Sequence, residues 1–238
     1  MLQQLLRPIF FGLAAVTWIA AACQGEDASL SQSPAAWTTG GPRAELLPKF
    51  SSSDQGGPAG GGLLTAASDA RDGLHGWWKR SIPVAGGRWY QFSAWRRVRG
   101  KAIARQTAVA RIFWKDAKGN PPLHDFLART TYREGERPRS EPEYPGDGEV
   151  QGEWVRTTGI FRCPEAGAQA EIELSFRWAA DTTVDWSDVQ LVPVEPPPAR
   201  KVRLAAVHYA PVDGQTNADK CRLFGPLVEQ AAKQQAEL

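Results

Sequence analysis

AEIELSFRW, residues 170–178, is the stretch that decides the predicted fold. Its apolar and polar residues alternate with a period of two, which is typical of a β-strand. One face carries Ala170, Ile172, Leu174, Phe176 and Trp178, and the other carries Glu171, Glu173, Ser175 and Arg177. A strand with one apolar and one polar face predicts an antiparallel sheet that covers a core on one side and meets solvent on the other.

Segments of similar pattern surround this stretch. We expect strands at residues 63–67, 77–84, 89–98, 106–114, 153–161 and 184–194. Turn-forming residues separate them at 116–120, and the charged, proline-rich residues 130–148 are expected to form an exposed loop. Strands of about ten residues without intervening helices predict a mainly β protein, with a jelly-roll β-sandwich over residues 37–193.

Residues 1–22 have the features of an export signal. Arg7 supplies a positive charge, and an uncharged run of 15 residues, 8–22, follows it. This run is shorter than the about 20 residues that a membrane-spanning helix needs. Small residues before Cys23 fit cleavage there, with lipid attachment at Cys23 or an uncleaved anchor helix as alternatives. We expect a disordered spacer at 23–36 and a periplasmic or extracellular protein, either free or membrane-anchored.

The charge of the chain argues against a nucleic-acid partner. The 28 Lys and Arg residues nearly balance the 26 Asp and Glu residues, and the formal net charge is +2. This net charge is too small to predict a polyanion partner. The basic residues at 96–105 lack the interleaved aromatic side chains that stack on bases, so we expect a solvated strand end and loop there.

Residues suited to catalysis are sparse. Cys163 and Cys221 have no CxxC or Cys/His context, so no zinc site is expected. These two cysteines can pair in an oxidising compartment, but their different contexts favour two free thiols. The histidines are dispersed and no GxSxG nucleophile motif is present. We therefore assign no catalytic residue and no cofactor-binding residue.

Aromatic side chains are the candidate binding residues, because an aromatic plane can stack on a sugar ring. The candidates are Trp77, Trp78, Trp89, Trp95 and Trp186. As the alternative, each ring is covered by a loop or by the second layer of the sandwich. Asp185 and Asp188, near the last strand, are candidate calcium ligands, because calcium prefers oxygen ligands.

Three stretches carry a resemblance to a known class of domain. They are GRWYQFSAWRR (87–97), GEWVRTTGIFRCPEAGAQAEIELSF (152–176) and VDWSDVQLV (184–192). Together they resemble carbohydrate-binding modules and galactose-binding-like domains, which are jelly rolls. This resemblance implies a carbohydrate or cell-envelope ligand for the sandwich.

The last part of the sequence changes in character. Residues 194–200 form a proline-rich linker, which is stiff and extended. VRLAAVH, residues 202–208, is nearly continuous in apolar residues and predicts a strand buried on both faces. Thr216 or Asn217 can cap a following helix, and Pro226 is expected to kink that helix or delay its start. The apolar stripe of this helix is Phe224, Leu227, Val228 and Ala231.

This strand-turn-helix resembles the opening of the carbon-nitrogen hydrolase (nitrilase/amidase) superfamily, an α/β fold with αββα layers. The matching residues are VRLAAVHYAP (202–211), Asn217 and LVEQAAKQQAEL (227–238). The family triad of Glu, Lys and Cys has no counterpart here, since Glu237 precedes the expected strand and Cys221 is expected to be a small buried residue of the helix. The resemblance implies that 201–238 is the truncated start of such a domain.

Two functions from different classes follow from these resemblances. In the first, the sandwich is an accessory domain attached to the incomplete start of a hydrolase of non-peptide C–N bonds, and this chain is itself non-catalytic. In the second, the protein is an exported carbohydrate-binding module or a structural envelope protein.

Overall fold

The computed structural model describes residues 36–127, 134–199, 201 and 204–234. These residues belong to two compact units, one that ends at Val194 and one that begins at Glu195. The predicted export signal at 1–22, the candidate lipid anchor Cys23 and almost all of the predicted spacer lie outside the described residues. These hypotheses therefore stay predictions.

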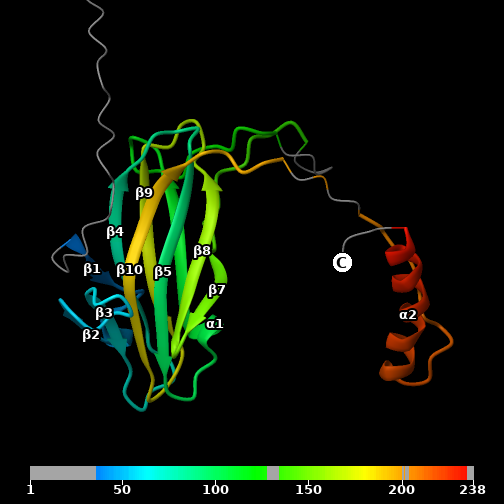
Figure 1. Ribbon diagram of the computed structural model, residues 1–238, viewed down its shortest axis with the longest axis horizontal. Helices are drawn as coiled ribbons and strands as arrows, with labels where there is room; N and C mark the ends of the chain where they lie inside the picture. The colour runs from blue at the N-terminus through cyan, green and yellow to red at the C-terminus, as the bar shows by residue number, and fades with distance from the viewer. Residues whose placement is uncertain (1–35, 128–133, 200, 202–203, 235–238) are drawn as a thin grey trace, which may run out of the picture. The chain divides into compact units, whose positions relative to one another are not determined.

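The first unit is a sandwich of two antiparallel sheets (Figure 1). The four-stranded sheet has the order β1 (Thr38–Gly40), β4 (His75–Pro83), β9 (Gln169–Arg177) and β6 (Ala108–Lys115). The six-stranded sheet has the order β2 (Lys49–Ser53), β3 (Leu63–Ala67), β10 (Thr183–Val194), β5 (Trp89–Arg99), β8 (Trp154–Arg162) and β7 (Gly146–Gln151). The predicted mainly β sandwich is confirmed.

Most of the expected strands are present with ends shifted by at most two residues. They are β3, β4, β5, β6, β8 and β10. The first residues of the strand expected at 106–114 belong instead to a short helix, α1 (Ala104–Thr107), and a 3-10 helix, η2 (Ala44–Leu46), lies between β1 and β2. β1, β2 and β7 were not predicted, because they are short or have a polar sequence without alternation, as in KFSSS and GDGEVQ.

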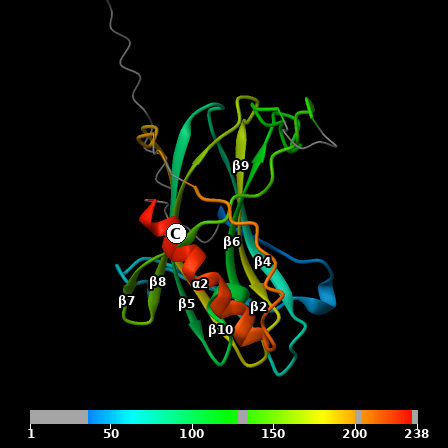
Figure 2. The same ribbon diagram turned by 90° about the vertical axis from the view of Figure 1, so that its right-hand side faces the viewer.

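β9 is an inner strand of the four-stranded sheet, paired with β4 on one side and β6 on the other (Figure 2). Its inward residues Ala170, Ile172, Leu174 and Phe176 are fully buried. Each large aliphatic or aromatic side chain buried in this way stabilises the fold by about 1.5–3 kcal/mol. The core that they enter also contains Trp78, Phe92, Trp114, Trp186 and Leu191.

Trp178 departs from the predicted alternation. β9 ends at Arg177, and Trp178 takes a left-handed backbone conformation with a φ of 50°. Its side chain is 64% exposed. The expectation that Trp178 continues the buried face is wrong, because a left-handed residue turns the chain out of the strand and changes the direction of its side chain.

A buried carboxylate connects three strands of the six-stranded sheet. Asp185 on β10 is 0% exposed. Its Oδ1 accepts a hydrogen bond from the hydroxyl of Thr65 on β3 at 2.8 Å. Its Oδ2 accepts hydrogen bonds from Arg97 and Arg99 on β5, each at 2.9 Å. Hydrogen bonds and opposite charges offset the cost of burying the carboxylate, so the cluster fixes β10 between its two neighbours.

The second unit contains the helix α2 (Asn217–Lys233). The predicted cap at Thr216 is confirmed: its hydroxyl accepts the N–H of Asp219, whose carboxylate accepts the N–H of Thr216. The helix begins at Asn217 and includes Pro226, so the expected delay of its start is not found. In the part of the chain that the structure describes, no helix is both long and apolar enough to cross a membrane.

The strand expected at 202–208 is not formed in its described part. Residues 204–208 have no regular secondary structure, and the side chain of Leu204 is 82% exposed. A strand buried on both faces needs neighbouring strands to bond its backbone groups, and none of the described strands pairs with this segment. The prediction of an α/β strand at 204–208 is therefore wrong, and the αββα architecture is not shown.

The Asp185 cluster makes a prediction about stability. Replacing Asp185→Ala leaves two arginines facing a site without a carboxylate, one of them largely buried, and should lower the free energy of unfolding by about 3 kcal/mol. Urea unfolding followed by tryptophan fluorescence measures this change. The control is Asp69→Ala, which removes an exposed carboxylate paired with Arg71 and should leave the midpoint nearly unchanged. Equal midpoints for both variants would contradict the role of the cluster.

Candidate functional site

The five candidate tryptophans fall into three groups. Trp78 and Trp186 belong to the core, so the hypothesis that they stack on a ligand is wrong for these two. Trp78 faces inward because it follows Trp77 by one position on β4, and its Nε1 donates to the carbonyl of Thr65 at 3.2 Å. Trp89 and Trp95 lie on the outer face of the six-stranded sheet, at positions that alternate with the buried side chains of β5. Trp77 lies on the outer face of the four-stranded sheet.

The two candidate calcium ligands do not form a metal site in the part of the chain that the structure describes. Asp185 is committed to Thr65, Arg97 and Arg99, so both of its oxygens already accept hydrogen bonds. Asp188 lies at an irregularity of β10 and accepts a hydrogen bond from Ser187. The described residues contain no group of three or more His, Cys, Asp or Glu side chains that could hold a metal ion.

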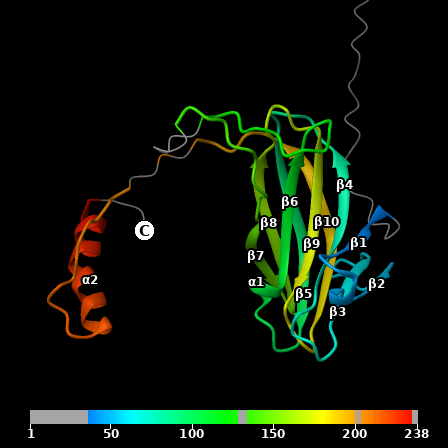
Figure 3. The same cartoon turned by 180° about the vertical axis from the view of Figure 1, so that it is seen from behind.

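Three aromatic side chains form a row on the outer face of the four-stranded sheet, near one end of its strands. The strands of this sheet are seen in Figure 3, from behind relative to Figure 1. His75 and Trp77 project from β4 to the same side, and their ring centroids are 5.4 Å apart. The exposed ring of Trp178 lies on the other side of His75, at 5.9 Å between centroids. We call Trp77, His75 and Trp178 the aromatic row.

Polar side chains of β9 continue the same face. Register places Ser175 between Trp77 and Val109, and it places Arg177 opposite His75. Further along the strand, Glu173 lies between Lys79 and Arg111 and forms an ion pair with Arg111 at 2.5 Å. Lys79 forms an ion pair with Glu171 at 3.3 Å.

An aromatic ring also contacts a cation on this face. The guanidinium of Arg111 lies 5.1 Å from the centroid of the ring of Phe113, which is two positions further along β6. The face therefore combines aromatic rings with charged planar groups.

Several polar atoms of this face are buried without a partner. Among the described side chains, eight buried nitrogen or oxygen atoms form no hydrogen bond, and four belong here: His75 Nε2, Arg111 Nε, Ser175 Oγ and Arg177 Nε. Burying a donor or acceptor unpaired costs about 1–3 kcal/mol. Native proteins contain few such atoms, and a cluster on one face points to a surface that is completed by a ligand or by water.

Burial and neighbouring charges also shift the ionisation of this face. The pKa of His75 is lowered, chiefly by burial and further by the nearby cations Arg177 and Arg111, so the imidazole is favoured in its neutral form. The pKa of Glu173 is raised, because burial outweighs the opposing effect of Arg111. Among the described side chains, the two carboxylates Glu171 and Glu173 are each engaged by a cation, which leaves no free carboxylate pair for acid-base chemistry at this face.

Two hollows adjoin this face. One of about 580 Å³ lies where the ends of several strands meet, and it is lined by Trp178, the residues up to Thr182, Asp72 and residues 100–102. Asp181 in this lining also has a positive φ, of 45°. The other, of about 170 Å³, lies at the β6 edge and is lined by Val109, Tyr144, Arg96, Arg105 and Asp147, among others. Val109 is also in the row of Ser175, so this hollow continues the face at its edge.

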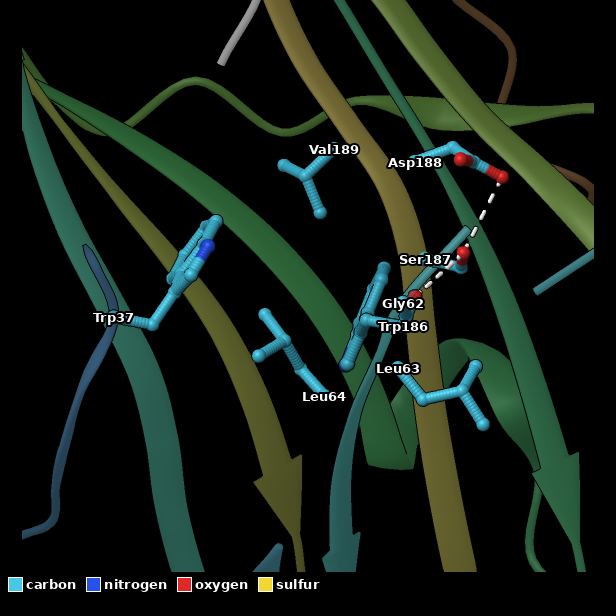
Figure 4. Close-up of a pocket in the computed structure, with 8 residues that line it drawn as sticks. All are labelled: Trp37, Gly62, Leu63, Leu64, Trp186, Ser187, Asp188 and Val189. Carbon is cyan, nitrogen blue, oxygen red and sulfur yellow. Dashed lines mark hydrogen bonds between the residues drawn. The ribbon is translucent and has the colours of Figure 1, made fainter. Parts of the chain in front are cut away.

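A third concave place, between β3 and β10, is too small for a ligand. Figure 4 shows its lining, with Trp37, Leu64 and Trp186 on one side and Ser187 and Asp188 on the other. Ser187 donates to the carbonyl of Gly62 at 2.8 Å. The free volume of about 10 Å³ is close to the minimum for one water molecule. We therefore interpret it as a packing defect around core tryptophans.

Sequence reasoning found only part of this site. Trp77 was a candidate, and the polar face of residues 170–178 was expected to meet solvent. His75 was set aside as dispersed, and Trp178 was placed on the buried face. His75 lies two positions before the predicted strand at 77–84, and it shares the face of Trp77 because β4 begins two residues earlier than expected. No local pattern signals the left-handed conformation of Trp178.

The described cysteines are both free thiols. Cys163 is fully buried, and burial raises the pKa of its thiol to about 12. Cys221 is exposed on α2, so the expectation that it is a small buried residue is wrong. The helix has no buried residue among those described, and Tyr209 of the same unit contacts it through Phe224, with ring centroids 5.4 Å apart. Burial and a raised pKa keep Cys163 protonated and inaccessible, which is the opposite of an activated nucleophile.

Comparison with known proteins gives similarities of structure only. No protein-family model and no curated protein sequence matches the chain. Many solved structures are similar at low identity, and three of them illustrate the likeness. The enzymatically active domain of tailspike protein 4 from bacteriophage CBA120 has 13% identity and a TM-score of 0.47, over 69% of this chain and 20% of that chain.

The other two contain carbohydrate-binding modules. One holds the CBM22-1 and GH10 modules of Clostridium thermocellum endo-1,4-beta-D-xylanase 10B complexed with xylohexaose, with 12% identity and a TM-score of 0.43 over 70% of this chain and 27% of that chain. The other is a CBM4 structure with 16% identity and a TM-score of 0.40, over 71% of this chain and 96% of that chain. The chain thus spans less than a third of the phage and xylanase structures. These similarities concern a β-sandwich and give the hydrolase resemblance no support.

Because Trp178 is largely exposed, we expect its replacement to change the stability of the fold very little. Trp178→Gly removes a ring that covers little of the core and relieves a left-handed conformation, so the free energy of unfolding should change by less than about 1 kcal/mol. Trp186→Ala, which empties a fully buried site, should cost about 3–5 kcal/mol. Thermal unfolding of the two variants measures the difference. A comparable loss in both would mean that Trp178 is part of the packing.

The two thiols predict different reactivities. At pH 9, where an ordinary thiol is half ionised, Cys163 stays protonated because its pKa is about 12, and it is also inaccessible. Iodoacetamide should therefore modify Cys221 in the folded protein and Cys163 only after denaturation. Peptide mapping by mass spectrometry distinguishes the sites. Rapid modification of Cys163 under native conditions would show that the sandwich opens locally.

Proposed function

We propose that the sandwich is a carbohydrate-binding domain and that it binds a saccharide on the outer face of the four-stranded sheet. The observation that carries the proposal is the aromatic row beside four buried polar atoms without partners. These two features occur together at this face, and they match the two kinds of surface that a sugar presents.

The chemistry of a sugar ring explains why both features are needed. The faces of a pyranose carry C–H groups, which pack on aromatic planes, whereas its edge carries hydroxyl groups that donate and accept hydrogen bonds. Trp77 and Trp178 offer planes on the two sides of His75. The part-exposed side chains of His75 and Arg177 offer hydrogen-bonding groups between them, and Ser175 lies buried beneath this face. Since these side chains are largely fixed by the sheet, little conformational entropy is lost when a ligand binds.

The outer face of the six-stranded sheet is the weaker candidate. Trp89 and Trp95 lie there, but the described buried polar atoms without partners do not cluster around them. Across from Trp95, the register places Arg156, and across from Trp89 it places Arg162. Arg162 is already paired with Asp125 and Glu165. We therefore assign the ligand to the four-stranded sheet.

The hydrolase resemblance of residues 201–238 stays a prediction without support. Export, a location in the periplasm or outside the cell, and lipid attachment at Cys23 also stay proposals, since they rest on residues 1–35. A carbohydrate or cell-envelope ligand agrees with export. A structural envelope role remains the alternative, and an absence of glycan binding would favour it.

Binding to a glycan array and titration calorimetry with the best glycan test the proposal. Trp77→Ala and Trp178→Ala should each weaken binding at least tenfold, because loss of an aromatic anchor typically costs more than about 1.4 kcal/mol. The matched controls Trp89→Ala and Trp95→Ala remove tryptophans from the other sheet and should leave affinity within about twofold. Loss of binding only in the controls would move the site to the six-stranded sheet, and no binding to any glycan would reject the function.

A further inference from the structure

We propose that the saccharide is acidic, and that its anionic group binds the guanidinium of Arg177. This inference rests on the proposed function and adds the chemical class of the ligand, which carries either a uronate carboxylate or a sulfate ester. It is carried by one cation that has no acidic partner in the described chain.

Three part-buried or buried arginines of the two sheets have acidic partners, whereas Arg177 has none among the described residues. Arg111 is paired with Glu173 at 2.5 Å, Arg97 with Asp185 at 2.9 Å, and Arg96 with Asp147 at 2.7 Å. Within the described residues, the side chain of Arg177 forms neither an ion pair nor a hydrogen bond, and its Nε is buried. A charge removed from water in this way is costly unless an opposite charge meets it.

The surroundings of Arg177 add to this cost. Burial lowers the pKa of Arg177 first, and the nearby Arg111 lowers it further, whereas Tyr144 and Glu173 act in the opposite direction. Arg177 and Arg111 both disfavour the protonation of His75. The cationic groups around the aromatic row therefore repel one another. An anion bound among them would remove this repulsion and supply the missing partner of Arg177.

The donors around Arg177 are arranged for an anion. A guanidinium presents two parallel N–H groups that match the two oxygens of a carboxylate or sulfate. Ser175 precedes Arg177 by two positions on β9 and lies buried beneath the same face. Neutral His75 lies opposite Arg177, and its unpartnered Nε2 can accept a hydrogen bond from a ligand hydroxyl or donate one, depending on the tautomer.

The net charge of the whole chain does not reveal the local charge of Arg177. A value of +2 does not by itself indicate an anionic ligand. The acidic side chains of this face are already paired, Glu171 with Lys79 and Glu173 with Arg111. Glu173 acts on Arg177 only from a distance, and Arg177 forms no ion pair with a described side chain. Attraction for an anion at this position is therefore specific to the site and does not depend on the overall charge of the protein.

Pairs of polysaccharides that differ only in charge test the inference. Polygalacturonate is compared with fully methyl-esterified polygalacturonate, and dextran sulfate with dextran, by titration calorimetry in 150 mM salt. We expect at least tenfold tighter binding to the charged member of one pair. Preference within the first pair identifies a carboxylate ligand, and preference within the second identifies a sulfate ligand; either supports the inference.

Variants separate the role of Arg177 from general attraction. Arg177→Gln should remove the preference for the charged polysaccharide, while its affinity for the neutral member and its unfolding temperature stay close to the wild type. Arg156→Gln removes a cation from the outer face of the other sheet and should keep the preference. The inference is overturned if the preference survives in Arg177→Gln, or if charged and neutral polysaccharides bind equally, although equal binding would leave the proposed function intact. Absence of binding to every polysaccharide tested here and on the array would reject both.

Discussion

The alternation of side chains along β9 is the constraint on which the rest of the structure depends. On one side of this strand, four fully buried side chains from Ala170 to Phe176 form part of the core. On the other side, Glu171, Glu173, Ser175 and Arg177 form the middle of the candidate site. A slip of one residue against β4 or β6 would place these polar groups in the core. The free energy that fixes the core thus also fixes the position of the binding face.

This coupling explains which features could be predicted from sequence. The strands of the sandwich follow from local period-two patterns, and most of them are found within two residues of their expected ends. The site is harder to predict, because it depends on register between strands that are far apart in the chain. Ser175 meets Trp77 across 98 positions of sequence in the register of β9 with β4. Trp178 was misplaced because its left-handed φ is set by the turn after β9, which no periodicity reveals. The apolar run at 202–208 was misread because a buried strand is defined by its neighbours as much as by its composition.

The core holds the candidate site in place, but the buried unpaired polar groups of the site lower the stability of the fold. Ser175 is fully buried between Trp77 and Val109, although its hydroxyl has no partner. Each such group costs free energy that apolar burial elsewhere must offset, and a left-handed tryptophan adds backbone strain. Such costs are expected where a surface is arranged in advance for a ligand. β4 and β9, which carry His75, Trp77, Ser175 and Arg177, are inner strands of the sheet, and this pairing holds that part of the candidate site in place.

The adjacent residues Trp77 and Trp78 contribute to both the core and the aromatic row. Trp78 packs edge-on against Phe50 with ring centroids 5.3 Å apart, and its Nε1 is held by the carbonyl of Thr65. Because neighbouring side chains of a strand point to opposite faces, anchoring Trp78 in the core also directs Trp77 toward the outer face of the sheet. Trp178 is held differently, by a turn in which Asp181 also has a positive φ. The aromatic row therefore combines one ring that the sheet fixes with one that a loop positions. Since loops change more easily than paired strands, selection that altered the proposed ligand would act first on residues 178–182.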